Sequence, residues 1–317
     1  MVTRQTSQVP RVPIVALVGA TASGKTALSL DLAERLGGEV VNTDAMQLYR
    51  GMDVGTAKLA PSERRGVPHH LLDVLTVREA ASVATFQLQA RSVVAALRER
   101  GATPLLVGGS ALYTRAVVDR FEFPGTDDAV RSRWESELDA VGARALHARL
   151  AAADPEAAAR IEPDNGRRVV RALEVVELTG RPFSASLPEQ TYLDPATVQV
   201  GVEIDRPTLD ERIERRVEAM FAGGLVAEVE RLLGEGLAEG RTASMAIGYR
   251  EVAEHLAGGL SLDEARERTV AATRRFARRQ LSWWRRDDRI VWVGHDDPDR
   301  VGRAVAAVEV VAATPGG

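Results

Sequence analysis

A glycine-rich segment close to the N-terminus has the residue types and spacing of a phosphate-binding loop. It follows the pattern G-x-x-x-x-G-K-[ST] through Gly19, Ala20, Thr21, Ala22, Ser23, Gly24, Lys25 and Thr26. Glycines let backbone N–H groups turn toward an anion, and the N-terminus of a following helix adds partial positive charge. In such a loop Lys25 contacts the phosphates and the Thr26 hydroxyl binds Mg²⁺. The motif predicts phosphate binding but not the reaction, since kinases, ATPases and transferases all use it.

A carboxylate is expected beside this loop. Asp44 follows a short apolar segment, Glu39–Asn42, that we interpret as a strand. Ligands bind at the carboxyl edge of an open α/β sheet, so Asp44 would face the phosphate loop. It could bind Mg²⁺ through water or act as a general base. Taken alone, it is equally typical of an aspartate that ends a strand in a turn.

Arginines are concentrated near the C-terminus, although the whole chain has a net charge of −4. Residues 261–264 match a capping box, and the segment from Arg266 to Arg286 is expected to form a helix. On a helical wheel one arc is apolar, with Val270, Phe276, Ala277, Leu281, Trp283 and Trp284. The opposite face has Arg274, Arg275, Arg278, Arg279, Arg285 and Arg286. Because this face does not mix signs, we favour contact with nucleic-acid phosphates over a merely solvated surface.

Short apolar strands alternate with helical segments in both halves of the chain. Strands are expected at Pro13–Val18, Glu39–Asn42, Pro104–Val107, Val198–Ile204 and Arg289–Val293, and the first helices at about Lys25–Leu36 and Val83–Arg100. This order predicts an α/β fold with a P-loop-type, open, mostly parallel sheet flanked by helices. The region between Asp127 and Thr179 favours helix throughout. We therefore expect a catalytic core of residues 1–123 and 197–317, interrupted by an all-helical insertion domain at 124–196.

Composition excludes several kinds of site. The chain has no cysteine, which rules out disulfides, a thiolate nucleophile and a cysteine-liganded zinc. His69 and His70 are adjacent, so their side chains point in different directions and we expect no metal there. The sequence has no apolar run long enough to span a membrane and no signal peptide. We expect a cytoplasmic protein without a membrane partner.

Seven blocks of sequence resemble the tRNA dimethylallyltransferases, also called the isopentenyl-pyrophosphate transferase family. They occur in order over roughly residues 12 to 290 and together are far more specific than the phosphate loop. The blocks are Val41–Lys58, Val67–Asp73, Ser82–Phe86, Gly108–Tyr113, Arg167–Val175, Ile247–Glu251 and Arg278–Trp283.

The resemblance implies a reaction. A dimethylallyl group would move from dimethylallyl diphosphate to N6 of the adenine immediately 3′ of the anticodon, adenosine 37, in tRNAs that read codons beginning with U. The products would be N6-dimethylallyladenosine and diphosphate. The phosphate loop would then hold the donor's diphosphate, with Thr26 and Mg²⁺ neutralising charge on the leaving group.

The resemblance also assigns roles to residues. Asp44 corresponds to the family's catalytic carboxylate, which resembles a general base acting on the adenine amine, and Lys25 and Ser110 belong to the same catalytic set. Ser110 stands where the family usually has threonine, and Ala45 where it commonly has serine. A diphosphate-binding arginine is implied at Arg212 or Arg216. The alternative for that pair is a solvated helix face that pairs with Glu211 and Glu214.

Contacts with tRNA are implied in six regions of the chain. We expect a monomer that binds the tRNA anticodon stem-loop, with the helical insertion as a second jaw around an extruded base. The implied residues are Asp44, Ala45, Met46, Gln47, Ser110, Arg131, Arg167, Arg168, Arg171, Gly248, Tyr249, Arg250, Arg274, Arg278, Arg279, Gln280, Trp283 and Arg285. Arg133 is a further candidate.

Three other functions are considered. Prenylation of free adenine nucleotides needs neither an arginine-rich helix nor an insertion. A small-molecule kinase needs an adenine site, which the sequence does not show. A non-catalytic RNA-binding protein would not need Lys25, Thr26 and Asp44 together.

Overall fold

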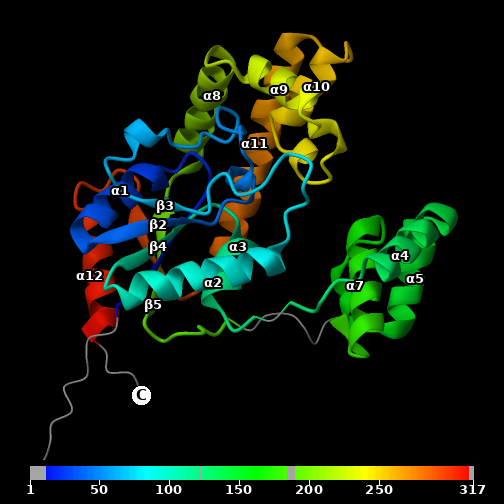
Figure 1. Ribbon diagram of the computed structural model, residues 1–317, viewed down its shortest axis with the longest axis horizontal. Helices are drawn as coiled ribbons and strands as arrows, with labels where there is room; N and C mark the ends of the chain where they lie inside the picture. The colour runs from blue at the N-terminus through cyan, green and yellow to red at the C-terminus, as the bar shows by residue number, and fades with distance from the viewer. Residues whose placement is uncertain (1–11, 122, 184–189, 314–317) are drawn as a thin grey trace, which may run out of the picture. The chain divides into compact units, whose positions relative to one another are not determined.

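The computed structural model describes residues 12–121, 123–183 and 190–313. The chain divides into two compact units. The larger unit contains the described residues up to Val118 and from Tyr192 onward, and the smaller unit is Asp119–Thr191. Figure 1 shows the larger unit as a sheet flanked by helices and the smaller one as helices alone.

The sheet of the larger unit has six strands in the order β3-β2-β4-β1-β5-β6, and every neighbouring pair is parallel. The expected α/β fold is confirmed, and the sheet is entirely rather than mostly parallel. The sequence did not predict the edge strand β3, formed by the two histidines considered above. The strands are β1 Ile14–Val18, β2 Gly38–Asn42, β3 His69–His70, β4 Thr103–Val107, β5 Thr197–Glu203 and β6 Ile290–Gly294.

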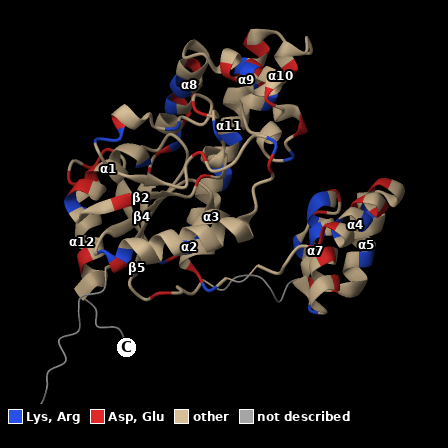
Figure 2. Cartoon of the chain, viewed as in Figure 1, with Lys and Arg blue, Asp and Glu red and all other residues tan. Residues whose placement is uncertain are grey.

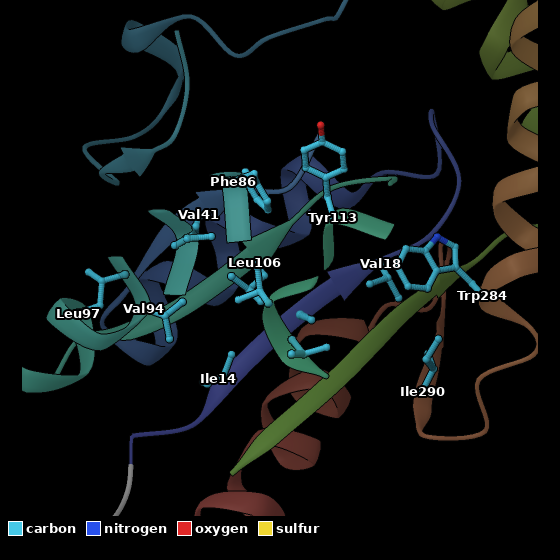
Figure 3. Close-up of a cluster of buried hydrophobic side chains, with 14 of the residues drawn as sticks. Ile14, Val18, Val41, Phe86, Val94, Leu97, Leu106, Tyr113, Trp284 and Ile290 are labelled. Atoms are coloured by element: carbon cyan, nitrogen blue, oxygen red, sulfur yellow. The ribbon is translucent and has the colours of Figure 1, made fainter. Parts of the chain in front are cut away.

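Both faces of the sheet are buried, which explains why its strands are continuous apolar runs. Because strand side chains alternate, β1 sends Val15 and Leu17 to one face, where α1 and α12 pack. Ile14 and Val18 point to the other face, which α2, α3 and the end of α11 cover (Figure 3). These helices are α1 Lys25–Leu36, α2 Val83–Glu99, α3 Ala111–Val118, α11 Leu262–Trp284 and α12 Arg300–Ala313.

A third group of helices lies beyond the carboxyl edge of the sheet. It comprises α8 Arg206–Ala222, α9 Leu225–Gly234, α10 Tyr249–Leu256 and the N-terminal part of α11 (Figure 1). These helices and the loop after β2 share a cluster of buried side chains that includes Tyr49, Met52, Leu232 and Val252. The sequence analysis assumed a helix around Arg212 and Arg216 but gave no bounds for it and did not predict α9 or α10. This group forms one wall of the site.

The smaller unit consists of α4 Asp128–Val141, α5 Ala143–Ala153, α6 Pro155–Arg160 and α7 Gly166–Thr179, with no strand in its described part. Its core contains Leu146, Leu150, Val169 and Leu173. The unit begins and ends five residues earlier than expected, at 119 rather than 124 and at 191 rather than 196. Backbone hydrogen bonds pair the entering and leaving segments (Leu193 N to Val118 O 2.8 Å, Arg120 N to Thr191 O 2.9 Å), so the change of unit falls between these pairs.

Candidate active site

The phosphate loop lies between the central strand β1 and α1. Gly19 and Gly24 have φ of 139° and 103°, which side-chain-bearing residues rarely adopt. Lys25, the first residue of α1, donates its ammonium to the carbonyls of Gly19 (3.1 Å) and Ala20. Burial and the neighbouring Arg216 lower the pKa of Lys25 to about 7, although Asp44 opposes the change. A bound anion would relieve this cost, because it supplies the negative charge that the buried ammonium lacks.

A cavity of about 340 Å³ opens at the loop. It combines backbone and ammonium donors of the loop with two arginines of α8 and the carboxylate of Asp44. Its walls are Thr21, Ala22, Gly24, Lys25, Thr26, Asp44, Gln47, Thr56, Ala57, Val107, Gly108, Gly109, Arg212, Arg216 and Gln280.

The two arginines of α8 are directed into this cavity rather than along a solvated face. Arg212 donates from Nη1 to the Ser23 carbonyl in the phosphate loop (3.3 Å), and Arg216 donates to the Thr56 carbonyl (3.1 Å). Burial lowers the pKa of Arg216 and Asp44 opposes that shift. The alternative of a face paired with Glu211 and Glu214 is therefore wrong.

Asp44 is held at the end of β2 by its own neighbours. Its Oδ1 accepts the N–H of Met46 (2.9 Å) and caps the short helix Ala45–Leu48. Asn42 fixes the backbone on both sides: its Oδ1 accepts the N–H of Asp44 (2.8 Å) and its amide donates to the carbonyl of Asp44 (3.0 Å). Nothing in the sequence drew attention to Asn42, although a strand-terminal asparagine two residues before a functional acid is a usable signal.

A second cavity, of about 360 Å³, adjoins the first and is mainly apolar. The two cavities share Thr21, Asp44, Thr56 and Arg216. Three residues that the resemblance assigned to the reaction or to tRNA line the second cavity: Ala45, Met46 and Ser110. Its remaining walls are Gly55, Val217, Met220, Met245, Ala246, Ile247, Tyr249, Thr269, Thr273, Phe276 and Arg279.

Gln280 does not have the surface position that a tRNA contact would need. It is 6% exposed, and its amide joins two loops of the site. Its Oε1 accepts the N–H of Thr21 (2.9 Å), and its Nε2 donates to the carbonyl of Gly109 (2.9 Å). A Cβ on Gly109 would lie 2.2 Å from that Nε2, so this close approach requires glycine. Gln280 therefore fixes the phosphate loop relative to the Gly108–Gly109 turn.

Two further residues assigned to tRNA are internal. Gly248 is buried with φ of 89°, and its N–H donates to Glu251 (2.8 Å). Tyr249 is 1% exposed and donates its hydroxyl to Glu228 (2.5 Å). Arg250 is exposed but forms an ion pair with Glu251 (2.5 Å). Gly248 and Tyr249 therefore have structural roles, and Tyr249 also lines the second cavity. Their contact with tRNA stays a prediction.

Glu228 is a functional residue that the sequence analysis missed. Besides Tyr249, its carboxylate accepts the N–H groups of Asp53, Val54 and Gly55 at 2.8 to 3.2 Å. It thereby attaches the loop that carries Thr56 to α9. The sequence signal that could have identified it is an acidic residue on the apolar side of a helical segment, because such an acid is buried and needs hydrogen-bond partners.

The arginine-rich helix α11 begins at the expected capping box, with Ser261 and Glu264 in reciprocal hydrogen bonds. Arg275, Arg278, Arg279 and Arg285 are exposed, and none of them forms an ion pair within the described ranges.

Arg274 differs from these four arginines. It contacts Asp210 (3.7 Å) and Glu214 (2.9 Å) of α8, where both signs of charge alternate (Figure 2). The expectation of a face with one sign of charge is wrong at this position, because α8 supplies acids that a single-helix wheel cannot show.

The adjacent tryptophans separate at the end of α11. Trp284 is buried among the sheet residues (Figure 3), whereas Trp283 is 50% exposed. The helical wheel, which placed both in the apolar arc, was wrong for Trp283. Its exposure is compatible with the tRNA contact implied by the resemblance.

In the smaller unit, two of the five candidate arginines support a buried acid. Arg131 and Arg171 both donate to the fully buried Glu174 (2.7 and 2.8 Å). These contacts give both arginines a structural role, and their contact with tRNA stays a prediction. Arg167 and Arg168 are exposed in the first turn of α7. Arg133 pairs with Glu177.

The site fits a magnesium ion that is bound mainly through phosphate. Thr26 is exposed at the first turn of α1 and shares its cavity with Asp44. Mg²⁺ commonly uses one or two protein oxygens and completes its shell with phosphate oxygens and water. Within residues 12–121, 123–183 and 190–313 no cluster of three or more histidines and acids forms a complete protein cage. No helix in this described part is both long and apolar enough to cross a membrane.

Comparison with known proteins gives a consistent result. A model of the IPP transferase family matches residues 47–287. A tRNA dimethylallyltransferase of a Nocardioides species is 72% identical over 304 residues, which cover 96% of this chain and 97% of that protein. The tRNA dimethylallyltransferase of Streptomyces coelicolor is 57% identical, with 96% and 98% covered.

Solved structures are similar over nearly the whole chain. The full-length tRNA isopentenylpyrophosphate transferase of Bacillus halodurans is 39% identical with a TM-score of 0.68, and the match covers 95% of this chain and 96% of that one. A eukaryotic dimethylallyltransferase acting on tRNA has a TM-score of 0.82 at 24% identity, covering 95% and 80%, and shares the fold.

Proposed function

Because this chain belongs to the IPP transferase family, we propose that it is an enzyme that transfers a dimethylallyl group from dimethylallyl diphosphate to N6 of adenosine 37 in tRNA. The observation that carries the proposal is the pair of adjoining cavities that share Asp44. One is rich in phosphate-binding groups, and the other is mainly apolar and large enough for a base and a prenyl group. The shared carboxylate lies between them, where the two substrates would meet.

The reaction forms a bond between adenine N6 and C1 of the dimethylallyl group and breaks the bond from C1 to the diphosphate oxygen. Asp44 receives the proton that N6 loses, and the electron pair of the broken bond leaves with the diphosphate. Lys25, Arg212 and Arg216 stabilise the negative charge that develops on the leaving group. A Mg²⁺ ion held by Thr26 and by diphosphate oxygens would neutralise part of the negative charge on the leaving group.

In this proposal, tRNA binding depends on exposed arginine side chains. Adenosine 37 must leave its stack to reach Asp44, so the loop needs to be held by its backbone while the base is extruded. Arg275, Arg278, Arg279 and Arg285 of α11, and Arg167 and Arg168 of the helical unit, are suited to phosphate contact by charge and exposure. Trp283 offers an exposed ring on which a base can stack.

The decisive experiment uses labelled dimethylallyl diphosphate with three acceptors: unmodified tRNA, free AMP and ATP. We expect label in tRNA that reads codons beginning with U, at adenosine 37, and none in AMP. Label in AMP alone would support a nucleotide prenyltransferase and refute the proposal. Hydrolysis of ATP without prenyl transfer would support a kinase or ATPase.

Two properties of the enzyme follow from the same proposal. We place it in the cytoplasm, because its substrate is tRNA and the chain has no cysteine to require an oxidising compartment. We also propose that the enzyme is a monomer. Sedimentation equilibrium with and without tRNA would measure the oligomeric state.

A further inference from the structure

His295 lies beside the phosphate loop, although nothing in the sequence marks it. It directly follows β6, and its backbone is held on both sides. Its N–H donates to the carbonyl of Glu203 (2.8 Å), and its own carbonyl accepts a guanidinium N–H of Arg300 (2.8 Å). The imidazole is 12% exposed. This side chain is therefore fixed in place rather than free in solvent.

The imidazole lies between an arginine and an acid. Its Nδ1 is 3.1 Å from Nη2 of Arg212, and its Nε2 is 3.6 Å from Oδ2 of Asp205. The same guanidinium donates from Nη1 to the Ser23 carbonyl of the phosphate loop (3.3 Å). A guanidinium has donors and no acceptor, so the contact requires an unprotonated Nδ1. His295 in this arrangement is neutral and carries its proton on Nε2, facing Asp205.

We propose that His295 is a positioning residue that makes diphosphate binding depend on pH. Its unprotonated Nδ1 holds Arg212 against the phosphate loop. Protonation removes that acceptor and places a second cation beside the guanidinium, which releases Arg212. The inference deepens the proposed function, on which it rests, by adding a pH-sensitive component to donor binding.

The charged groups around the ring set the direction of the effect. Asp205 favours the protonated imidazole, while Arg212 and Arg300 oppose it. Protonation of the ring therefore lowers affinity for the donor, whereas the chemical step at Asp44 does not involve this ring.

The test compares two substitutions. His295→Asn keeps an acceptor near the position of Nδ1 but does not titrate, and His295→Ala removes the acceptor. The Michaelis constant for dimethylallyl diphosphate and kcat are measured at saturating tRNA between pH 5.5 and 8. We expect the wild-type Michaelis constant for the donor to rise about three- to tenfold toward low pH, the range that the loss of one hydrogen bond implies. The alanine variant should show the raised constant at every pH, with kcat nearly unchanged.

The asparagine variant also serves as the control for protonation of the donor itself. It should retain only the pH dependence that the diphosphate contributes. Asp205→Asn is a second control, because asparagine can still cap α8 as Asp205 does through Thr208 N (2.9 Å). This variant removes the negative charge beside the ring and keeps the contact between Nδ1 and Arg212, so its Michaelis constant for the donor at pH 8 should match that of the wild type. Thermal unfolding of each variant checks that the fold is intact.

Identical pH profiles for wild type and His295→Asn would overturn the inference, and so would an unchanged constant in His295→Ala. Calorimetric binding of inorganic pyrophosphate to the same variants separates this inference from the proposed function. If pyrophosphate binding follows the expected pH dependence while no prenyl group reaches tRNA, the proposed function fails and the role of His295 stands.

Discussion

Lys25 and Asp44 have opposite charges and line the same cavity, so each affects the other's environment. Burial and Arg216 make the ammonium of Lys25 costly, and Asp44 compensates only in part. A diphosphate placed at the loop would reverse this balance, because it pairs with Lys25 and both arginines of α8 at once. The cavity is thus electrostatically prepared for an anion, whereas Asp44 at its edge is available to the second substrate.

Asp44→Asn tests the chemical role of this carboxylate. The amide keeps the shape of the side chain and the cap on Met46 N, but it cannot accept the proton from adenine N6. We expect kcat to fall by about 10²- to 10⁴-fold, the usual contribution of a general base. Single-turnover transfer to tRNA measures this step, and the Michaelis constant for the donor should change much less. Near-normal turnover would mean that Asp44 is not the base.

The buried and the exposed sides of helix α11 have different contacts. Its buried side positions the site through Gln280, while its exposed arginines are suited to tRNA phosphates. The helical period allows both, since residues two apart point to different sides of a helix. If the exposed arginines bind tRNA as proposed, the same helix that contacts the RNA also contacts the phosphate loop through Gln280.

Arginine substitutions on α11 distinguish a phosphate contact from a solvated charge. Arg278→Ala and Arg285→Ala should each weaken tRNA binding and reduce the slope of log affinity against log salt by about 0.7 to 1. Arg274→Ala is the matched control, because Arg274 already pairs with Glu214. It should leave the slope unchanged. Filter binding at several salt concentrations measures all three, and equal slopes throughout would refute the phosphate contacts.

Glu174 makes the stability of the helical unit depend on pH. Burial alone would raise the pKa of Glu174, but hydrogen bonds from Arg171 and Arg131 outweigh it and hold the pKa below its ordinary value. A depressed folded-state pKa adds stability above the unfolded value, about 4.3, and this stability is lost as pH falls through the folded value.

Glu174→Gln should therefore destabilise the unit by about 1 to 3 kcal/mol at neutral pH and by less below about pH 4. Scanning calorimetry of the full chain measures the effect. Glu177→Gln, which breaks the more exposed pair with Arg133, should change stability much less, because solvent screens that pair. A constant difference from pH 7 to 3 would contradict the role of Glu174.

In the whole molecule, the all-parallel sheet brings the residues assigned to the reaction to one edge. The phosphate loop follows β1, Asp44 follows β2, Ser110 follows β4 and His295 follows β6. The carboxyl ends of parallel strands lie at the same edge, so residues far apart in sequence meet there. The smaller unit is inserted between α3 and β5, and none of its described residues lines either cavity.

This organisation predicts that the helical unit can be removed without loss of the donor site. Val118 and Leu193 are joined by a hydrogen bond of 2.8 Å, so a short glycine linker can replace residues 119–191. The shortened chain should bind inorganic pyrophosphate with unchanged affinity in calorimetry. Its affinity for tRNA should fall about tenfold or more if Arg167 and Arg168 contact phosphates. Unchanged tRNA affinity would exclude the insertion as a binding element.

The sequence by itself determined the local parts of this protein. Gly19 to Thr26, the acid after β2 and the cap at Ser261 were correctly located, because a few neighbouring residues decide such backbone conformations. The α/β order and the helical insertion followed from the spacing of apolar residues for the same reason.

Only the tertiary structure decided which long side chains meet. Arg212 contacts Ser23 in the phosphate loop, Gln280 joins Thr21 to Gly109, and Arg274 and Arg171 pair with acids instead of facing solvent. A flexible charged or amide side chain selects its partner from whatever the packed elements bring within reach, and that neighbourhood is not encoded in the adjacent residues. His295, next to no recognisable motif, contacts Arg212 for the same reason.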